Sequence, residues 1–198
     1  MLTQIINGHI LTPQGWMKDG SVLISDGKIL EVTNSDLAVI GAKVVDAKGM
    51  YIVPGFVAMN VHGGGGHDFK ECTEEAFHSA IAAHMKHGAT TLFPTLSSSP
   101  KELICKAVSI CEKLMAEKDG PVLGLHVEGP YLNTKMAGNL YDVKDPDEEE
   151  YRSILESTNC IKRWDASPEL PGAHDFARYL RSKDILAAIT HTEAEFGD

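Results

Sequence analysis

Segments typical of strands and helices alternate from residue 54 onward, at a spacing of roughly 25–35 residues. The predicted strands are short runs at residues 56–62, 90–94, 122–127, 160–164 and 185–189. The predicted helices lie between them, at about residues 73–86, 100–117, 146–157 and 172–182. This α/β alternation predicts a parallel sheet built from right-handed βαβ units. An open doubly wound sheet and a (β/α)8 barrel both satisfy the pattern.

Polar residues gather where the predicted strands end, and this favours the barrel. They are Asn60, His62, Glu128, Glu169 and His191. In a TIM-like barrel the carboxyl ends of the strands form the rim of the active site. A whole barrel has eight βα units and about 250 residues. We therefore expect this 198-residue chain to be the first part of a (β/α)8 TIM-like barrel, truncated after about five βα units.

Residues 1–53 form a separate predicted module, which ends at Pro54-Gly55. Its β-prone segments are interrupted or joined by turn signals at Asn7-Gly8, Asp26-Gly27 and Lys48-Gly49. We expect a small antiparallel β module that is too thin to be stable alone. Residues 54–198 then make up the barrel part.

The composition is that of an ordinary globular protein, with 43% hydrophobic residues and a formal net charge of −10. The surplus of acidic residues, 28 against 18 basic, argues against a nucleic-acid partner. No apolar run approaches the roughly 18 residues of a transmembrane helix, so no membrane partner is expected. No signal peptide precedes the first strand and the four cysteines form no CxxC pair, which predicts free thiols in the cytoplasm.

The segment HVEGPYLN, residues 126–133, places Glu128 at the end of a short apolar strand. A buried carboxylate is costly unless it is paired, so Glu128 either meets an arginine, caps a helix or binds a ligand. A barrel would aim His191, at the end of the fifth strand, toward the same axis. Carboxylate plus imidazole suits Zn²⁺ or a similar divalent ion, although two ligands are too few for a complete site. A histidine at a strand end is more often simply a hydrogen-bonded polar residue.

Three neighbouring features have both a functional and a plain structural interpretation. Asn60 and His62 alternate on one face, so they are either a second metal or substrate site or a polar strand end. The glycines at 63–66 allow a close backbone approach but lack the Lys-Ser/Thr of a P-loop, and a flexible loop is the favoured interpretation. His126 faces the same side as Glu128 and is expected to orient it.

Six stretches together resemble the amidohydrolase superfamily and, within it, the N-acetylglucosamine-6-phosphate deacetylases. They lie at residues 52–56, 61–65, 87–95, 126–133, 167–169 and 190–194. The most specific is HVEGPYLN, which matches a His-x-Glu-Gly-Pro-aromatic-Leu-Asn motif. The resemblance implies an amidohydrolase-type barrel from about residue 54 and a β-sandwich to which residues 1–53 contribute.

The function implied by the resemblance is metal-dependent deacetylation of N-acetylglucosamine 6-phosphate to glucosamine 6-phosphate and acetate. Glu128 would be the first metal ligand and His191 the second. The family's third ligand, a histidine, and its catalytic aspartate would lie beyond residue 198, so the chain alone is not expected to turn over substrate. Ala58, Asn60 and His62 stand where most amidohydrolases have Asp-x-His-x-His, which favours one metal ion, expected to be zinc, over two.

The family's sugar-phosphate loop corresponds to Gly138, Asn139 and Leu140. The side chain of Leu140 cannot hydrogen-bond a phosphate, so two alternatives to the amino-sugar phosphate substrate stay open. One is another amidohydrolase that acts on a cyclic amide or a peptide-like substrate. The other is a non-catalytic half-barrel. By resemblance, the full-length protein is expected to be a homodimer.

Overall fold

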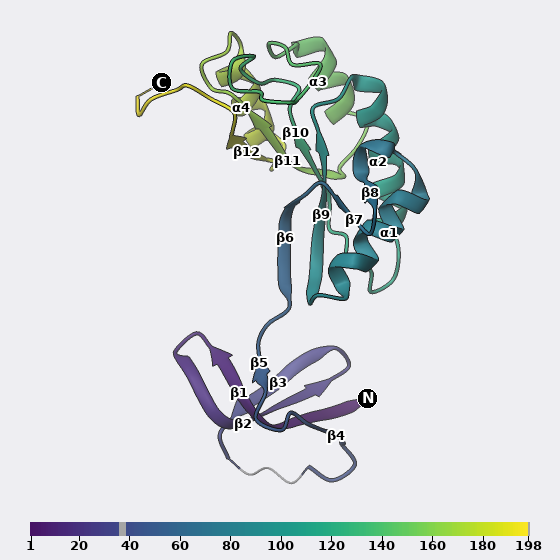
Figure 1. Ribbon diagram of the computed structural model, residues 1–198, viewed down its shortest axis with the longest axis vertical. Coiled ribbons are helices and arrows are strands. Elements are labelled where there is room, and N and C mark those ends of the chain that lie inside the picture. The colour runs from purple at the N-terminus through teal and green to yellow at the C-terminus, as the bar shows by residue number, and fades with distance from the viewer. Residues whose placement is uncertain (36–38, 198) are drawn as a thin grey trace. The chain divides into compact units, whose positions relative to one another are not determined.

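The structure is a computed structural model that describes residues 1–35 and 39–197. The chain divides into two compact units, Met1–Gly55 and Phe56–Asp198. Figure 1 shows both units with their elements labelled.

The amino-terminal unit is one five-stranded sheet in the order β3-β2-β1-β4, with β5 also paired to β1. Its strands are β1 (Leu2–Thr12), β2 (Gly15–Ser25), β3 (Lys28–Thr33), β4 (Lys43–Asp46) and β5 (Tyr51–Ile52). The hairpin predicted at Asp26-Gly27 joins β2 and β3. The expectation of a purely antiparallel module is wrong, because β4 and β5 both pair with β1 in the parallel direction.

The turn predicted at Asn7-Gly8 is a β-bulge inside the continuous strand β1. Ile5 pairs with Val22 and Gly8 with Gly20, so β1 carries one more residue than β2 over this stretch. Asn7 has a φ of 56° and donates a side-chain hydrogen bond to Asp46 on β4 at 3.0 Å. The left-handed conformation that the Asn-Gly pair favours is therefore absorbed by a bulge, which bends a strand without ending it.

The carboxy-terminal unit is built on a five-stranded parallel sheet in the order β12-β11-β10-β9-β6. The strands are β6 (Phe56–Val61), β9 (Ala89–Ser97), β10 (Leu125–Glu128), β11 (Ile161–Ala166) and β12 (Leu186–Ile189). Every strand lies beside its neighbour in the sequence. A doubly wound sheet reverses its strand order part-way, whereas a barrel does not. The winding is therefore that of a parallel half-barrel.

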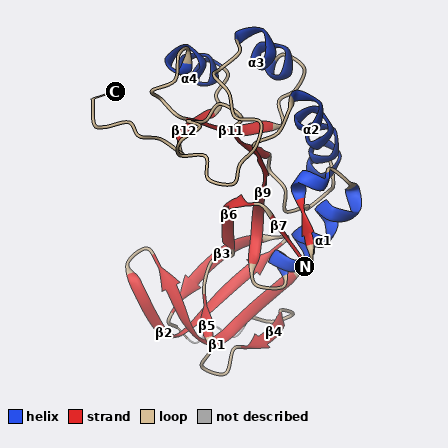
Figure 2. Cartoon of the chain, turned by 45° about the horizontal axis from the view of Figure 1, so that its top comes forward, coloured by secondary structure: helices blue, strands red, loops and turns tan. Residues whose placement is uncertain are grey.

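Four helices connect these strands and cover one face of the sheet (Figures 1 and 2). They are α1 (Glu74–Met85), α2 (Lys101–Met115), α3 (Glu148–Leu155) and α4 (Ala173–Ser182). Thr73 caps α1 as predicted, since its side chain accepts a hydrogen bond from the Ala76 N–H. Helix α3 starts two residues later than the expected 146, because the carboxylate of Asp147 caps it by accepting from Glu150.

The core lies between the sheet and these helices. It includes an aromatic cluster of four buried rings, Tyr131, Tyr151, Trp164 and Phe176. Burying each such side chain contributes about 1.5–3 kcal/mol. The Trp164 indole also donates to the Gly129 carbonyl at 2.8 Å. The core thereby fixes the turn that directly follows Glu128.

Two further findings bear on the sequence predictions. The four cysteines, Cys72, Cys105, Cys111 and Cys160, are free thiols. None of the helices within residues 1–35 and 39–197 combines the length and apolar character that a membrane crossing requires.

Candidate functional site

Glu128 is the centre of the site, because three polar side chains meet its two carboxylate oxygens. Its Oε1 lies 2.8 Å from Nε2 of His191, and its Oε2 lies 3.1 Å from Nε2 of His62. The Asn60 amide donates to the same Oε2 at 3.5 Å. Only 7% of Glu128 is exposed. The structure thus brings both predicted residue pairs onto one carboxylate.

These contacts shift the charges of the site strongly. The hydrogen bonds from His62 and His191, opposed by burial, lower the pKa of Glu128 to about 2. Contact with Glu128 raises the pKa of His62, also against burial. Burial opposes the charged form of His191, but the Met136 carbonyl and Glu128 together raise its pKa. Without a bound cation the site is therefore a carboxylate between two histidines that favour protonation.

The second ring nitrogen of His191 defines its tautomer. Nδ1 lies 2.9 Å from the Met136 carbonyl, which can only accept a hydrogen bond, so Nδ1 carries the proton. In the neutral ring, Nε2 then presents a lone pair toward the Glu128 carboxylate. Two acceptors face each other, and either a proton or a cation must lie between them. This is the arrangement by which a carbonyl orients a metal-binding histidine.

The donor set fits part of a zinc site. Carboxylate and imidazole are ordinary zinc ligands, and catalytic sites use three protein ligands with water in the fourth position. Among the residues that the structure describes, no group of three or more His, Cys, Asp or Glu side chains has an arrangement suited to a metal ion. His62 approaches the opposite carboxylate oxygen from His191 and does not complete a three-ligand set.

His126 does not orient Glu128, and that prediction is wrong. Its Nδ1 lies 3.0 Å from the Thr95 hydroxyl, and its Nε2 lies 2.9 Å from Asp165 Oδ1 without hydrogen-bond alignment. Thr95 in turn accepts a hydrogen bond from the Val61 N–H at 2.9 Å. These contacts form a polar layer that crosses β6, β9, β10 and β11 beside the site. On β10 it lies two residues before Glu128, whereas Asp165 of β11 is the register partner of Glu128.

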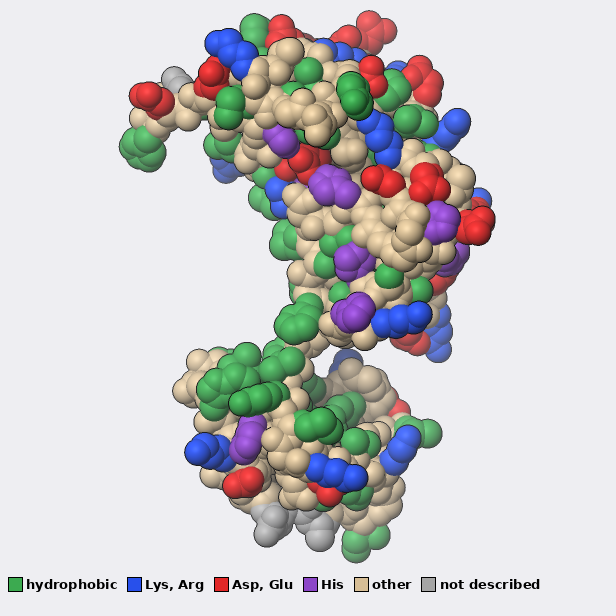
Figure 3. All heavy atoms as spheres, viewed as in Figure 1, with side chains coloured by type: hydrophobic (Ala, Val, Ile, Leu, Met, Phe, Trp, Pro, Cys, Tyr) green, Lys and Arg blue, Asp and Glu red, His purple; other side chains and the backbone are tan. Residues whose placement is uncertain are grey.

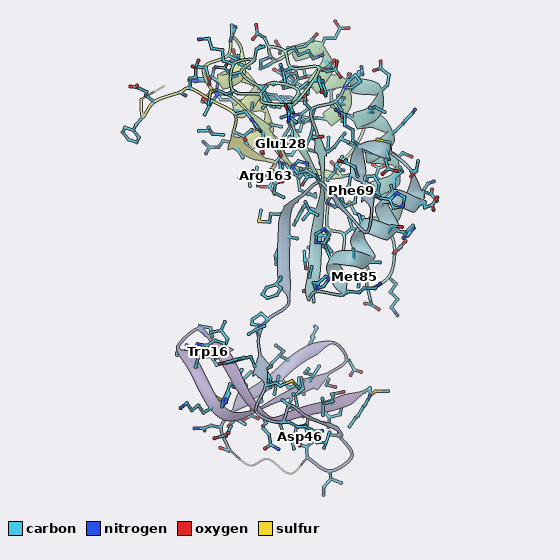
Figure 4. The ribbon with its side chains drawn as sticks, in the orientation of Figure 1. Trp16, Asp46, Phe69, Met85, Glu128 and Arg163 are labelled. Atoms are coloured by element: carbon cyan, nitrogen blue, oxygen red, sulfur yellow. The ribbon has the colours of Figure 1, made fainter. Side chains whose placement is uncertain are left out.

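Arg163 completes this layer from β11. Its guanidinium donates two hydrogen bonds to Asp165, at 2.7 and 3.0 Å. Burial opposes the charged form of Asp165, but His126 and Arg163 together lower its pKa. Figure 4 shows Arg163 near Glu128, on the neighbouring strand. Sequence reasoning missed this pair, because the predicted strand ended at residue 164, whereas β11 extends to Ala166 and its i, i+2 spacing places both residues on one face.

The glycine run at 63–66 forms an ordered hairpin, not the flexible loop that we expected. Strand β7 (Gly63–Gly64) pairs with β8 (His67–Asp68), and a short 3-10 helix, η1 (Phe69–Glu71), follows. His84 of α1 holds the hairpin through a contact of 2.9 Å with the Gly63 carbonyl. Figure 3 shows histidine and acidic side chains on the face of the carboxy-terminal unit that is turned toward the viewer.

The predicted sugar-phosphate residues Gly138, Asn139 and Leu140 lie in the loop between β10 and α3. Gly138 and Asn139 are exposed, and Leu140 is half-buried. The same loop reaches the site through the carbonyl of Met136, which accepts from His191.

No protein-family model matches the chain. The N-acetylglucosamine-6-phosphate deacetylase of Lysinibacillus sphaericus is 26% identical over 197 residues, which cover 97% of this chain and 51% of the relative. A Mycobacterium smegmatis N-acetyl-D-glucosamine-6-phosphate deacetylase, solved in complex with N-acetyl-D-glucosamine-6-phosphate, superposes with a TM-score of 0.88 at 28% identity. That match covers 98% of this chain and 51% of the other.

The chain is similar to the amino-terminal half of N-acetylglucosamine-6-phosphate deacetylases. It spans about half the length of the deacetylases that it matches. A triazine hydrolase from Arthobacter aurescens has the same fold, with a TM-score of 0.64 at 14% identity over 95% of this chain and 52% of that one. The likeness to the deacetylases includes both units of the chain, since it extends over nearly all of its residues.

Proposed function

We propose that this chain is the amino-terminal half of a metal-dependent N-acetylglucosamine-6-phosphate deacetylase. The observation that carries the proposal is the pairing of Glu128 with His191, from the two motifs HVEGPYLN and THTEA. Likeness to deacetylases over almost the whole chain supports it. The reaction is hydrolysis of an acetamide, and its products are glucosamine 6-phosphate and acetate.

In this proposal Glu128 and His191 hold one divalent ion, zinc, together with a ligand from outside the described residues. When bound, such an ion supplies a water of lowered pKa and polarises the acetamide carbonyl. Glu128 contributes a carboxylate that is already ionised at neutral pH. Met136 keeps the Nε2 lone pair of His191 directed toward that carboxylate.

Asn60 and His62 serve the substrate side of the site. The Asn60 amide is neutral and donates to Glu128, so it cannot compete as an anionic ligand for a second ion. His62 is partly exposed, with 44% of its side chain accessible, and its Nε2 meets the oxygen of Glu128 that His191 leaves free. One metal ion is therefore favoured over two.

The phosphate of the substrate is assigned to the loop at Gly138, Asn139 and Leu140. Asn139 provides the side-chain donor of this group, and Leu140 offers only its backbone. Because this loop offers so few side-chain donors for a phosphate, one competing function is kept: hydrolysis of a cyclic amide or a peptide-like substrate at the same metal site.

The wider architecture completes the proposal. The half-barrel belongs to a (β/α)8 barrel of the amidohydrolase type, and the amino-terminal sheet is one layer of a small β-sandwich. The domain boundary lies at residues 53–54. The whole enzyme works as a cytoplasmic homodimer on a small amino-sugar phosphate, without a nucleic-acid or membrane partner.

An assay of the full-length protein tests the proposal. Acetate release from N-acetylglucosamine 6-phosphate is measured beside release from unphosphorylated N-acetyl amino sugars and opening of cyclic amides. We expect the sugar phosphate to be the preferred substrate, and the 198-residue chain alone to be inactive. Preference for a cyclic amide would replace the proposed substrate, and loss of all activity from Glu128→Gln would support the proposed metal site.

A further inference from the structure

The loop that follows β11 makes hydrogen bonds to the loops on both sides of it. The Ser167 hydroxyl, which is fully buried, accepts from the Asn133 N–H at 2.7 Å. The same hydroxyl lies within donating distance of the carbonyls of Thr190, at 3.1 Å, and His191, at 2.8 Å. One side chain therefore joins the loop after β10 to the loop after β12.

Glu169, two residues further on, makes a second connection between the same loops. Its Oε1 accepts from the Asn133 side-chain amide at 2.7 Å and from the Glu193 N–H at 2.9 Å. Its Oε2 accepts from the Thr192 hydroxyl at 2.6 Å. The two residues that follow His191 are thus held by one carboxylate.

His191 lies between these attachments in an unfavourable backbone conformation. Its φ is +47°, in the left-handed region that residues other than glycine rarely adopt. Such a conformation persists only where the surrounding structure fixes it. Ser167 holds the backbone at His191 itself, and Glu169 holds Thr192 and Glu193.

We infer that Ser167 and Glu169 are positioning residues that hold the imidazole of His191 against Glu128. We call these two residues and their contacts the loop bracket. The inference rests on the proposed function for the role of the metal, whereas the bracket consists of hydrogen bonds within the chain. Neither Ser167 nor Glu169 touches the reacting atoms, so their effect is exerted through His191.

Two substitutions of Glu169 separate positioning from a general loss of stability. Glu169→Ala removes all three accepted hydrogen bonds. Glu169→Gln keeps an oxygen at the Oε1 position, where two of the three are accepted, and the Thr192 hydroxyl can turn to accept from the new amide. Glu31→Ala, an exposed carboxylate on β3 of the other unit, is the matched control.

Three measurements are made on the full-length protein, which in the proposal supplies the remaining metal ligand: amide hydrogen exchange of Glu193 by NMR without metal, zinc affinity by competition titration, and the thermal unfolding midpoint. For Glu169→Ala we expect exchange of the Glu193 amide to become faster and zinc affinity to fall by about 10–100-fold, the usual effect of losing a group that orients a ligand. The unfolding midpoint should stay close to that of the unaltered chain. Glu169→Gln should keep the Glu193 exchange rate and the zinc affinity close to those of the unaltered protein. Glu31→Ala should change neither of these two quantities.

The outcomes separate the inference from the proposed function. If Glu169→Ala leaves the Glu193 exchange rate unchanged, the loop bracket is wrong. Faster exchange with unchanged zinc affinity would also overturn it, because the bracket would then order the loop without positioning His191. If Glu128→Gln leaves the zinc affinity of the full-length protein unchanged, the metal assignment of the proposed function fails. Glu193 exchange then decides only whether Glu169 fixes the backbone after His191.

Discussion

Oε1 of Glu128 lies 2.8 Å from Nε2 of His191, although 63 positions separate the two residues in the sequence. They come from the end of β10 and from the loop after β12, with β11 between them in the sheet. Because Nδ1 of His191 is directed to the Met136 carbonyl, only two states satisfy both residues. Either the histidine is protonated and forms an ion pair, or both residues ligate a cation.

The first prediction concerns the cation. Glu128→Gln removes the anionic ligand and leaves a neutral amide of nearly the same shape, so zinc affinity should fall by more than about 100-fold. The measurement is a competition titration of the metal-free, full-length protein with zinc. Glu31→Gln, at an exposed position on β3, is the control and should bind like the unaltered chain. Equal affinity for the Glu128→Gln variant would contradict the ligand assignment.

The second prediction is a pH dependence of the metal-free chain. The pKa of Glu128 is lowered from 4.5 to about 2, so its stabilising contribution is present above pH 4.5 and is lost as pH falls toward 2. The pKa values of His62 and His191 are raised from 6.5, so their contribution is present below pH 6.5 and is lost as pH rises through the raised values. These contacts therefore stabilise the fold most between pH 4.5 and 6.5.

Urea unfolding at a series of pH values tests this dependence. Other groups titrate over the same range, so the relevant quantity is the difference in the free energy of unfolding between the unaltered chain and Glu128→Gln. That difference should be largest between pH 4.5 and 6.5 and should shrink on both sides. A difference that is constant from pH 3 to pH 9 would show that the contacts of Glu128 with the two histidines do not couple to folding.

Local patterns were sufficient for much of the carboxy-terminal unit. The Thr73 cap and the start of strand β6 at Phe56 follow from adjacent residues, and the structure confirms both. Barrel winding also followed from a local regularity, since consecutive βα units of similar length place each strand beside the previous one. Because the carboxyl ends of the strands converge in a barrel, the sequence predicted that Glu128 and His191 lie together, and the structure places them 2.8 Å apart.

Non-local pairing explains what the sequence could not provide. Asn7-Gly8 favours a left-handed backbone in a turn and in a bulge alike, and only the pairing of β1 with β2 decides between them. The partner of His126 depends on the non-local pairing with β11, which sets His126 opposite Arg163 and Glu128 opposite Asp165. The Nε2 of His126 then lies 2.9 Å from Asp165 Oδ1, two residues further along β11 than its register partner. The loop bracket likewise depends on the loops after β10, β11 and β12, which meet only in the folded sheet. No spacing in the sequence therefore predicts that Glu169 holds the residues after His191.

The third prediction concerns the ion pair between Arg163 and the buried Asp165, beside the site. Arg163→Met leaves Asp165, which is fully buried, without its two guanidinium hydrogen bonds. Among the described residues, only His126 would then face this buried carboxylate, so the free energy of unfolding should fall by about 3 kcal/mol. Arg178→Met is the matched control, because Arg178 pairs with Asp175 at an exposed position and should cost less than about 1 kcal/mol. Urea unfolding of both variants measures the contrast, and similar losses would refute it.

The last prediction concerns the hairpin beside the site. A Cβ added at Gly63 would lie 2.1 Å from the His67 carbonyl oxygen and 2.8 Å from the Asp68 Cα, so the two strands of the hairpin must separate. Gly63→Ala should therefore lower the free energy of unfolding by about 3 kcal/mol, the upper range for overpacking. At Gly66 a Cβ meets nothing within 4 Å. Gly66→Ala should cost only the roughly 1 kcal/mol of its left-handed backbone.

The hairpin also bears on His62, because the Phe69 N–H, just after β8, donates to the His62 carbonyl at 2.9 Å. Separation of the hairpin strands should disturb this bond and thereby the contact of His62 with Glu128. Gly63→Ala should consequently reduce the pH-dependent difference in stability described above, whereas Gly66→Ala should preserve it. If the two variants unfold at the same urea concentration and show the same pH dependence, the glycine at 63 is not required by the packing of the hairpin.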